Sequence, residues 1–273
     1  MTFDIDALRV APGKNLKLES IDPRSTPEWP GIDKEEGKAR VEELNERLEL
    51  LQELLYAEGK QRVLVVLQAM DAGGKDGTIR HVFDGVNPSG VRAPAFKRPS
   101  SDELAHDYLW RIHKEVPKDG EIVIFNRSHY EDVLVVRVMD IAPEKRWRKR
   151  YEHIVDFERM LSDEGTTIVK IYLHISKEEQ KERLQARLDT PEKNWKFESG
   201  DLDMRAKWGD FMAAFEEALE KTSTANAPWY VIPADRKWYR NIAVLEILVQ
   251  TLEGLDMAFP PPEEGLDTVV IPD

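Results

Sequence analysis

Residues 62–78 read RVLVVLQAMDAGGKDGT, and this stretch decides the fold that we expect. The run Val63–Leu67 is apolar without alternation, which is typical of a strand buried on both faces of a parallel sheet. A glycine-rich turn follows at once, and residues 79–83 continue as a helical pattern. Such a turn points backbone N–H groups and a helix N-terminus at anionic oxygens, and Lys75 adds a positive charge. The stretch therefore predicts a phosphate-binding loop.

The loop departs twice from the usual pattern GxxxxGK[ST]. Ala69 occupies the position of the first glycine, and Asp76 occupies that of the serine or threonine that holds Mg²⁺. A tight strand-to-helix turn with an incidental lysine is therefore an alternative. Asp71 and Asp76 favour the phosphate site, because carboxylates repel bare phosphates unless a divalent cation lies between them. We expect Asp71 to supply the metal contact.

Short apolar runs recur along the chain and alternate with helical patterns. The runs cover residues 121–125, 167–175 and 228–232, and the helical patterns cover 34–56, 145–161, 177–188 and 201–219. Strands that alternate with helices indicate βαβ units and a mainly parallel sheet. We therefore expect an α/β fold.

A second polar cluster, NRSHYED at 126–132, follows the run 121–125. Ligands of open α/β sheets bind beyond the carboxyl ends of the strands, so Asn126, Arg127 and Glu131 are expected to face the phosphate loop. An aspartate at the end of this strand would help to organise magnesium, but Asn126 is uncharged. Glu131 is the candidate for the missing charge, whereas His129 is interpreted as a packed residue.

Arg183 and Arg187 form a third candidate group. They are four residues apart and share one helix face, where two guanidinium groups can clamp phosphoryl oxygens. The stretch 183–208 that begins with them is interpreted as a lid. An ordinary solvated helix pair with salt bridges is the alternative.

The charge distribution excludes some partners. The net charge is −13, which argues against general affinity for nucleic acid or anionic membranes. Residues 85–101 nevertheless hold Arg92, Lys97 and Arg98 with no acidic residue, and 133–151 are also mainly basic. Without a series of base-stacking aromatic residues, this pattern fits a small or linear polyanion better than a duplex.

Length and composition bound the organisation of the chain. A chain of 273 residues is long enough for one α/β domain with an appended segment. Residues 1–33, which include Pro12, Pro23, Pro27 and Pro30, are expected to form an irregular arm, and residues 259–273 a surface tail. The absence of cysteine excludes thiol chemistry, and the first residues lack a signal-peptide pattern. We expect a cytoplasmic protein without a membrane span.

Three segments in this order resemble the polyphosphate kinase 2 family: MDAGGKDGTI at 70–79, FNRSHYEDV at 125–133 and RLDTPEKNWKFESGDLDMR at 187–205. The resemblance covers about residues 34–255. It implies a P-loop kinase-like three-layer αβα sandwich with a mainly parallel central sheet and a helical lid, placed here at 34–258. It also implies phosphoryl transfer between polyphosphate and nucleotides, and a homo-oligomer. The FNRSHYED form resembles the branch that accepts both AMP and ADP.

The resemblance and the chemistry of the residues together assign roles. The residues expected to carry catalysis are Asp71, Lys75, Arg127, Glu131, Arg183 and Arg187. Nucleotide phosphates are assigned to Ala72, Gly73, Gly74, Lys75, Asp76, Gly77 and Thr78; Mg²⁺, or alternatively Mn²⁺, to Asp71 and Glu131; polyphosphate to Lys97, Arg98, Lys193 and Lys196. A nucleotide phosphate is largely ionised at pH 7, so its attack needs no strong general base.

Two other functions are compatible with the same residues. An ATP-dependent nucleoside monophosphate kinase would share the phosphate loop, because one fold hosts many chemistries. A non-catalytic phosphate-binding scaffold would explain Ala69, Asp76 and Asn126 as a lost magnesium site.

Overall fold

A parallel sheet forms the centre of the computed structural model, which describes residues 3–13, 15–29 and 31–272. Its five strands lie in the order β2-β3-β1-β4-β5. Their bounds are β1 Arg62–Ala69, β2 Val91–Arg92, β3 Glu121–Phe125, β4 Thr166–His174 and β5 Trp229–Pro233. β1 is central and pairs in parallel with β3 on one side and β4 on the other. The carboxyl ends of the strands therefore meet at one edge, as the alternating pattern predicted.

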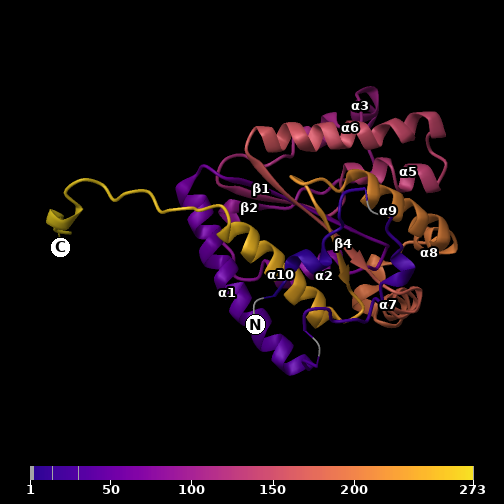
Figure 1. Ribbon diagram of the computed structural model, residues 1–273, viewed down its shortest axis with the longest axis horizontal. Coiled ribbons are helices and arrows are strands. Elements are labelled where there is room, and N and C mark those ends of the chain that lie inside the picture. Colours follow the sequence, from indigo (N-terminus) through magenta and orange to yellow (C-terminus); the bar gives the residue numbers. More distant parts are fainter. Residues whose placement is uncertain (1–2, 14, 30, 273) are drawn as a thin grey trace.

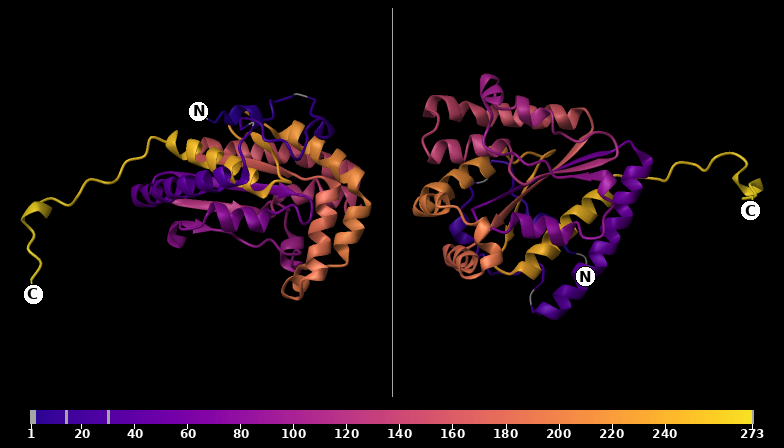
Figure 2. Two further views of the ribbon diagram at one scale, coloured as in Figure 1. Left: turned by 90° about the horizontal axis from the view of Figure 1, so that it is seen from below. Right: turned by 180° about the vertical axis from the view of Figure 1, so that it is seen from behind.

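Helices cover both faces of the sheet (Figure 1). One layer contains α1 (Lys34–Glu58), α2 (Lys75–Val82) and α10 (Lys237–Glu253), and the other contains α5 (Val135–Val138), α6 (Glu144–Asp163) and α9 (Trp208–Thr222). Two short helices, α3 (Ser101–Ala105) and α4 (Trp110–His113), lie between β2 and β3 in the chain. The helices α7 (Lys177–Asp189) and α8 (Gly200–Ala206) lie at one end of the molecule (Figures 1 and 2). This is the expected three-layer α/β architecture.

The first long helix shows how local sequence fixes an element. The Asp33 side chain caps α1 by accepting hydrogen bonds from the backbone N–H groups of Glu35 and Glu36. The Glu36 carboxylate in turn accepts a hydrogen bond from the backbone N–H of Asp33. Gly59 ends the helix with φ 65°, in the left-handed region that glycine favours. The predicted helix 34–56 is thus confirmed and extends by two residues.

Several elements differ from the sequence expectation, and among them are the short helices α3, α4 and α5, which were not predicted. The predicted helix 201–219 is wrong as a single element, because Lys207 leaves helical geometry at φ −94° and ψ 25° and divides it into α8 and α9. The two-residue strand β2 and the helix α10 were not predicted. α10 is buried on most of its surface, so its apolar residues show little of the 3.6-residue periodicity by which helices are recognised.

The N-terminal residues pack along the sheet. The backbone N–H of Val10 donates to the carbonyl of Trp229 at 2.8 Å, and Arg9 forms an antiparallel bridge with Tyr230 of β5. Leu8 and Leu18 are buried. Pro30, which the sequence placed in this arm, lies outside the described residues, as do residues 1–2, 14 and 273.

The C-terminal residues extend away from the body of the molecule (Figures 1 and 2). Phe259 and Ile271 are among the exposed large apolar side chains of this segment. None of the helices in the described ranges is long and apolar enough to cross a membrane.

Gly37 of α1 allows a close approach of α10. A Cβ built at Gly37 would lie 2.5 Å from a ring carbon of Trp238, whereas one at Gly209 of α9 would meet nothing within 4 Å. We expect Gly37→Ala to lower the free energy of unfolding by about 1–2 kcal/mol through overpacking. Gly209→Ala should raise it by up to about 1 kcal/mol through helix propensity. Chemical denaturation measures the free energy of unfolding of both variants. A change of the same sign in the two variants would contradict this account of the α1–α10 contact.

Candidate active site

The predicted phosphate loop connects β1 to α2. Its backbone bends so tightly that a Cβ on Gly73 would lie 2.4 Å from the Cβ of Ala69 and 2.6 Å from the carbonyl oxygen of Met70. Gly74 adopts φ 102° and caps the first turn of α2. The Lys75 ammonium group donates to the Ala69 carbonyl at 3.2 Å, so the lysine folds back over the loop. Glycine is therefore required at 73, and Ala69 is accommodated because residue 73 has no side chain.

The last predicted member of the loop, Thr78, is fully buried. Its hydroxyl group donates to the Gly74 carbonyl at 3.1 Å, and its backbone N–H donates to the same oxygen at 2.8 Å. The Thr78 side chain therefore stabilises the start of α2 from within. The Thr78 hydroxyl is therefore occupied within the protein, and Lys75 is the cationic side chain that the loop itself carries.

The two residues that break the usual phosphate-loop pattern bind each other. Asn126, directly after β3, donates from Nδ2 to Oδ1 of Asp76 at 2.6 Å. In the usual pattern the strand end carries the carboxylate and the loop carries a neutral hydroxyl group. Here the loop residue Asp76 carries the carboxylate, and Asn126 at the end of β3 is neutral. The pair still contains one carboxylate, which counts against reading Asp76 and Asn126 as traces of a lost site.

Glu131 lies in the 3₁₀ turn η4 (His129–Asp132), beside the loop. Gln68 of β1 donates from Nε2 to Glu131 Oε1 at 3.3 Å and to Ser128 Oγ at 3.1 Å. Burial raises the pKa of Glu131, with nearby Asp71 adding to the rise and Lys75 and Arg127 opposing it. These charged groups line one cavity of about 90 Å³. The structure therefore brings together four of the predicted catalytic residues.

The residues around this cavity fit a magnesium ion held partly by substrate. Within the described part of the chain, no three histidine or acidic side chains are grouped closely enough to bind a metal by themselves. Mg²⁺ in phosphoryl-transfer sites is usually held by one or two carboxylates together with substrate phosphates. Asp71 and Glu131 satisfy this requirement. The Oδ1 atom of Asn126 is a further buried oxygen without a hydrogen-bond partner among the described residues.

Arg183 of α7 binds the back of the phosphate loop. Its Nη1 donates to the carbonyls of Ala72 at 3.2 Å and Gly73 at 2.9 Å, and its Nη2 donates to the carbonyl of Ala234 at 2.7 Å. Its Nε pairs with Glu179 at 2.8 Å. Arg183 therefore acts on the shape of the loop, and its donors are occupied by protein groups.

Arg187 faces the following segment, the predicted lid, which contains the turn η5 (Pro191–Lys196) and α8. Its Nη1 donates to the Lys196 carbonyl at 3.0 Å and pairs with Asp201 at 3.1 Å. The two predicted clamp arginines thus bind different segments: Arg183 the loop, and Arg187 the lid.

The four predicted polyphosphate residues lie in two places. Lys193 and Lys196 belong to η5 in the lid segment. Lys97 and Arg98 line a separate cavity of about 670 Å³, which the chain after β2 builds with Phe96, Trp110 and Arg111 among its other lining residues. The described contacts do not join these two pairs.

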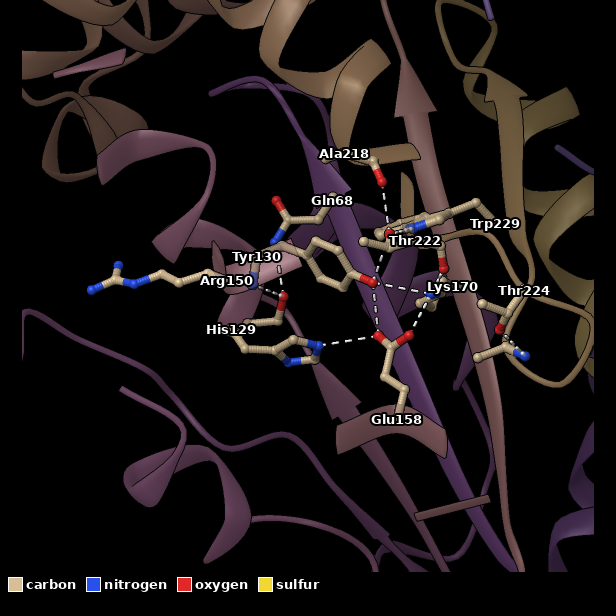
Figure 3. Close-up of polar contacts among 12 residues, drawn as sticks. Gln68, His129, Tyr130, Arg150, Glu158, Lys170, Ala218, Thr222, Thr224 and Trp229 are labelled. Carbon is tan, nitrogen blue, oxygen red and sulfur yellow. Dashed lines mark hydrogen bonds and ion pairs between the residues drawn. The ribbon is translucent and has the colours of Figure 1, made fainter. Parts of the chain in front are cut away.

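A buried polar network contacts His129 and Tyr130 of η4 (Figure 3). Glu158 of α6 accepts from the Tyr130 hydroxyl at 2.8 Å and lies 3.1 Å from His129 Nε2. Lys170 of β4 pairs with Glu158 at 2.5 Å and also donates to Tyr130. Burial would raise the pKa of Glu158, but Lys170 and His129 outweigh it and lower that pKa. His129 is thus a packed residue, as interpreted from the sequence.

The sequence missed several residues of this site. Gln68, which positions Glu131, is hidden within an apolar strand pattern. Gln180 of α7 donates to the Asp71 carbonyl at 3.0 Å and accepts from Arg205 at 2.9 Å. Arg240 of α10 lies against Gly74. Gln68, a polar residue inside the apolar run of β1, is the one signal that the sequence offered for these residues. The roles of Gln180 and Arg240 depend on contacts between distant segments.

Comparison with known proteins gives consistent matches. Residues 31–260 match the family described as Polyphosphate kinase 2. A protein of Meiothermus ruber named AMP/ADP-polyphosphate phosphotransferase is 60% identical over 263 residues, which cover 96% of this chain and 98% of that protein. An ADP-polyphosphate phosphotransferase of Rhodopseudomonas palustris is 48% identical, with 79% of this chain and 78% of the relative covered.

Solved structures agree with these matches. The crystal structure of Polyphosphate Kinase 2 from Arthrobacter aurescens TC1 superposes with a TM-score of 0.92 at 48% identity, covering 96% of this chain and 93% of that one. A putative polyphosphate kinase 2 from Pseudomonas aeruginosa gives a TM-score of 0.81 at 32% identity, with 87% of this chain and 50% of that chain covered.

The network in Figure 3 leads to a stability prediction. Glu158→Gln leaves the fully buried Lys170 without its carboxylate, so we expect the free energy of unfolding to fall by about 3–5 kcal/mol. Glu152→Gln, an exposed change on the same helix, should alter it by less than about 0.5 kcal/mol. Chemical denaturation of both variants measures the difference. Similar small losses for the two would show that the buried pair does not stabilise η4.

Proposed function

The chain belongs to the polyphosphate kinase 2 family, and we propose that it transfers phosphoryl groups from inorganic polyphosphate to AMP and to ADP. The relative that shares 60% of its residues over nearly the whole of both chains is named for both acceptors. A homo-oligomer and a cytoplasmic location stay predictions from the sequence.

One observation carries this function: the cavity that joins Lys75 and Arg127 to Asp71 and Glu131. Two cations suit the oxygens of a phosphoryl group in transfer, and two carboxylates suit a divalent cation. Phosphoryl transfer depends mainly on such positioning and neutralisation of charge.

The reaction proposed for this site is a direct displacement. A phosphate oxygen of AMP or ADP attacks the terminal phosphorus of polyphosphate, and a new P–O bond forms. The bond from that phosphorus to the bridging oxygen breaks, and its electron pair stays on the shortened chain. Lys75 and Arg127 donate hydrogen bonds to the oxygens of the phosphoryl group, where they stabilise its charge during transfer. No proton has to be abstracted from an ionised phosphate.

Asp71 and Glu131 are the residues that would hold Mg²⁺, with Mn²⁺ as the alternative. A bound divalent cation neutralises negative charge on the phosphate oxygens and so reduces their repulsion of the two carboxylates. Gln68 fixes the Glu131 carboxylate, and Gln180 fixes the backbone of Asp71. The side chains that would hold the ion are thus positioned by neutral amides.

The lid and loop residues are assigned by their contacts. Arg183 shapes the phosphate loop through the carbonyls of Ala72 and Gly73, so we propose a positioning role for it. Arg187 joins α7 to the lid through Asp201 and remains the proposed contact of the lid with the phosphoryl group. Lys193 and Lys196, with Lys97 and Arg98, remain the proposed contacts of the polyphosphate chain.

Lys75→Ala tests the proposed donor and the loop together. In phosphorus NMR with Mg²⁺, long-chain polyphosphate and AMP, the wild type should form ADP and then ATP. Lys75→Ala should slow both steps at least about a hundredfold, because one oxyanion donor is typically worth that much. Lys38→Ala, an exposed change on α1, serves as the control and should match the wild type.

Two results would contradict the proposal. ADP formed from ATP and AMP, with none from polyphosphate, would indicate an ATP-dependent nucleoside monophosphate kinase. Binding of polyphosphate or nucleotide without turnover with either donor would indicate a scaffold.

Asp71→Asn tests the metal assignment. We expect the Mg²⁺ concentration for half-maximal activity to rise at least about tenfold, since one charged ligand is lost. Asp76→Asn is the matched control in the same loop, and its Mg²⁺ requirement should change less because the Asp76 carboxylate already binds Asn126. An unchanged Mg²⁺ requirement in Asp71→Asn, or the larger change in Asp76→Asn, would refute the assignment.

A further inference from the structure

The helix α7 holds the phosphate loop by its carbonyl groups. Gln180 donates from Nε2 to the carbonyl of Asp71 at 3.0 Å. Arg183 donates from Nη1 to the carbonyls of Ala72 and Gly73 at 3.2 and 2.9 Å. Gln180 and Arg183 are three residues apart, so they lie on one face of the helix. Three successive carbonyl groups of the loop therefore bind this face of α7.

The lid helix α8 binds the same glutamine from its other end. Gln180 is fully buried, and its Oε1 accepts a hydrogen bond from Nη1 of Arg205 in α8 at 2.9 Å. The same Arg205 nitrogen also donates to the carbonyl of Lys177, the first residue of α7, at 2.7 Å. The nitrogen of the amide thus binds the loop, and its oxygen binds the lid. Because the amide is planar, it cannot turn towards one partner without moving relative to the other.

Two more residues of α8 lie close to Asp71. Met204 lines the cavity that contains Asp71. Burial raises the pKa of Asp201, and the nearby Asp71 carboxylate adds to the rise. Asp201, Met204 and Arg205 are spaced at i, i+3 and i+4, so they share one face of α8. This face of α8 is therefore directed towards α7 and Asp71.

We propose that Gln180 is a positioning residue that links the place of the lid helix α8 to the place of Asp71 in the phosphate loop. The inference rests on the proposed function for the role of Asp71, whose carboxylate would hold Mg²⁺. Mg²⁺ requires near-ideal octahedral geometry, so a small displacement of one ligand weakens its binding. The lid therefore acts on the reaction through the shape of the loop.

The first test changes the lid and measures the loop. Arg205→Met removes the charged donor, and Gln180→Leu removes the amide. Lys181→Met and Gln185→Leu are exposed changes of the same types on α7 and serve as matched controls, which should match the wild type. In the protein without ligand or metal, mass spectrometry measures hydrogen exchange of the backbone N–H groups at 72–75. Exchange should be at least about tenfold faster in Arg205→Met and Gln180→Leu, because a hydrogen bond that holds the loop closed is lost.

Kinetics test whether this link serves the reaction. With polyphosphate as donor and AMP as acceptor, kcat should fall at least about tenfold in Arg205→Met and Gln180→Leu, as expected for partners of a metal-binding residue. The KM for AMP should change less than about twofold, because neither residue is a proposed contact of the acceptor. Arg205→Lys retains a charged donor and should recover most of the lost kcat. The double variant should lose no more than either single variant, since both changes break one link.

Other results would overturn the proposal. Unchanged exchange at 72–75 in Arg205→Met would show that the lid does not act on the loop. Losses of kcat that multiply in the double variant would show that Gln180 and Arg205 act separately. Faster exchange without any loss of kcat would restrict Gln180 to a structural role. Arg205 is only half-buried, so Arg205→Met decides the question even where Gln180→Leu fails to fold.

Failure of the proposed function gives a different result. A wild type that uses ATP and not polyphosphate contradicts that function, and the same comparison of kcat is then made with ATP as donor. If the wild type turns over neither donor, the exchange measurement decides, because it needs no substrate. Equal exchange in Arg205→Met and Lys181→Met would then overturn the link, and faster exchange in Arg205→Met alone would support it.

Discussion

The parallel pairing of β1 with β3 and β4 is the constraint on which the site depends. It brings the turn after β1, the turn after β3 and the helix after β4 to the same edge of the sheet. Lys75, Arg127 and Arg183 are more than fifty residues apart from one to the next, yet each follows a neighbouring strand. A shift of register between β1 and β3 would separate Gln68 from Glu131 and Asn126 from Asp76. The arrangement of these site residues therefore depends on the pairing of the strands.

The close packing of the loop imposes a second constraint. Gly73 leaves no room for a side chain, and Gly74 lies against two guanidinium groups. Backbone carbonyls of the loop accept hydrogen bonds from Arg183, and the carbonyl of Gly74 also lies near Arg240. Two cations therefore hold the carbonyl side of the loop in place.

Much of this fold could be predicted from the sequence, because long buried strands and glycine-rich turns carry strong local signals. The runs at β1, β3, β4 and β5 and the helix α1 were recognised within a residue or two at most ends. β2 was missed because two residues give no pattern, and α10 because burial on nearly all sides removes the periodicity. Lys75 and Asp71 were singled out for their own chemistry, and both line the cavity beside the loop, while their roles stay predictions.

The rest of the site depends on contacts that no local pattern contains. The Asp76–Asn126 hydrogen bond joins two strand ends, and the burial of Arg240 follows from packing of α10 against the loop. Separately, each of these residues was a departure from a pattern or an ordinary charged residue. The structure shows that the two departures from the usual pattern, the carboxylate at 76 and the amide at 126, bind each other.

The contact of the N-terminal residues with β5 has a consequence for solubility. β5 is the last strand of the sheet on its side, and such a strand presents unpaired backbone groups to which another chain can add. Val10 and Arg9 occupy part of that row by their own antiparallel pairing. The N-terminal residues thus cover part of the β5 edge and make it a poor template for the addition of strands from other chains.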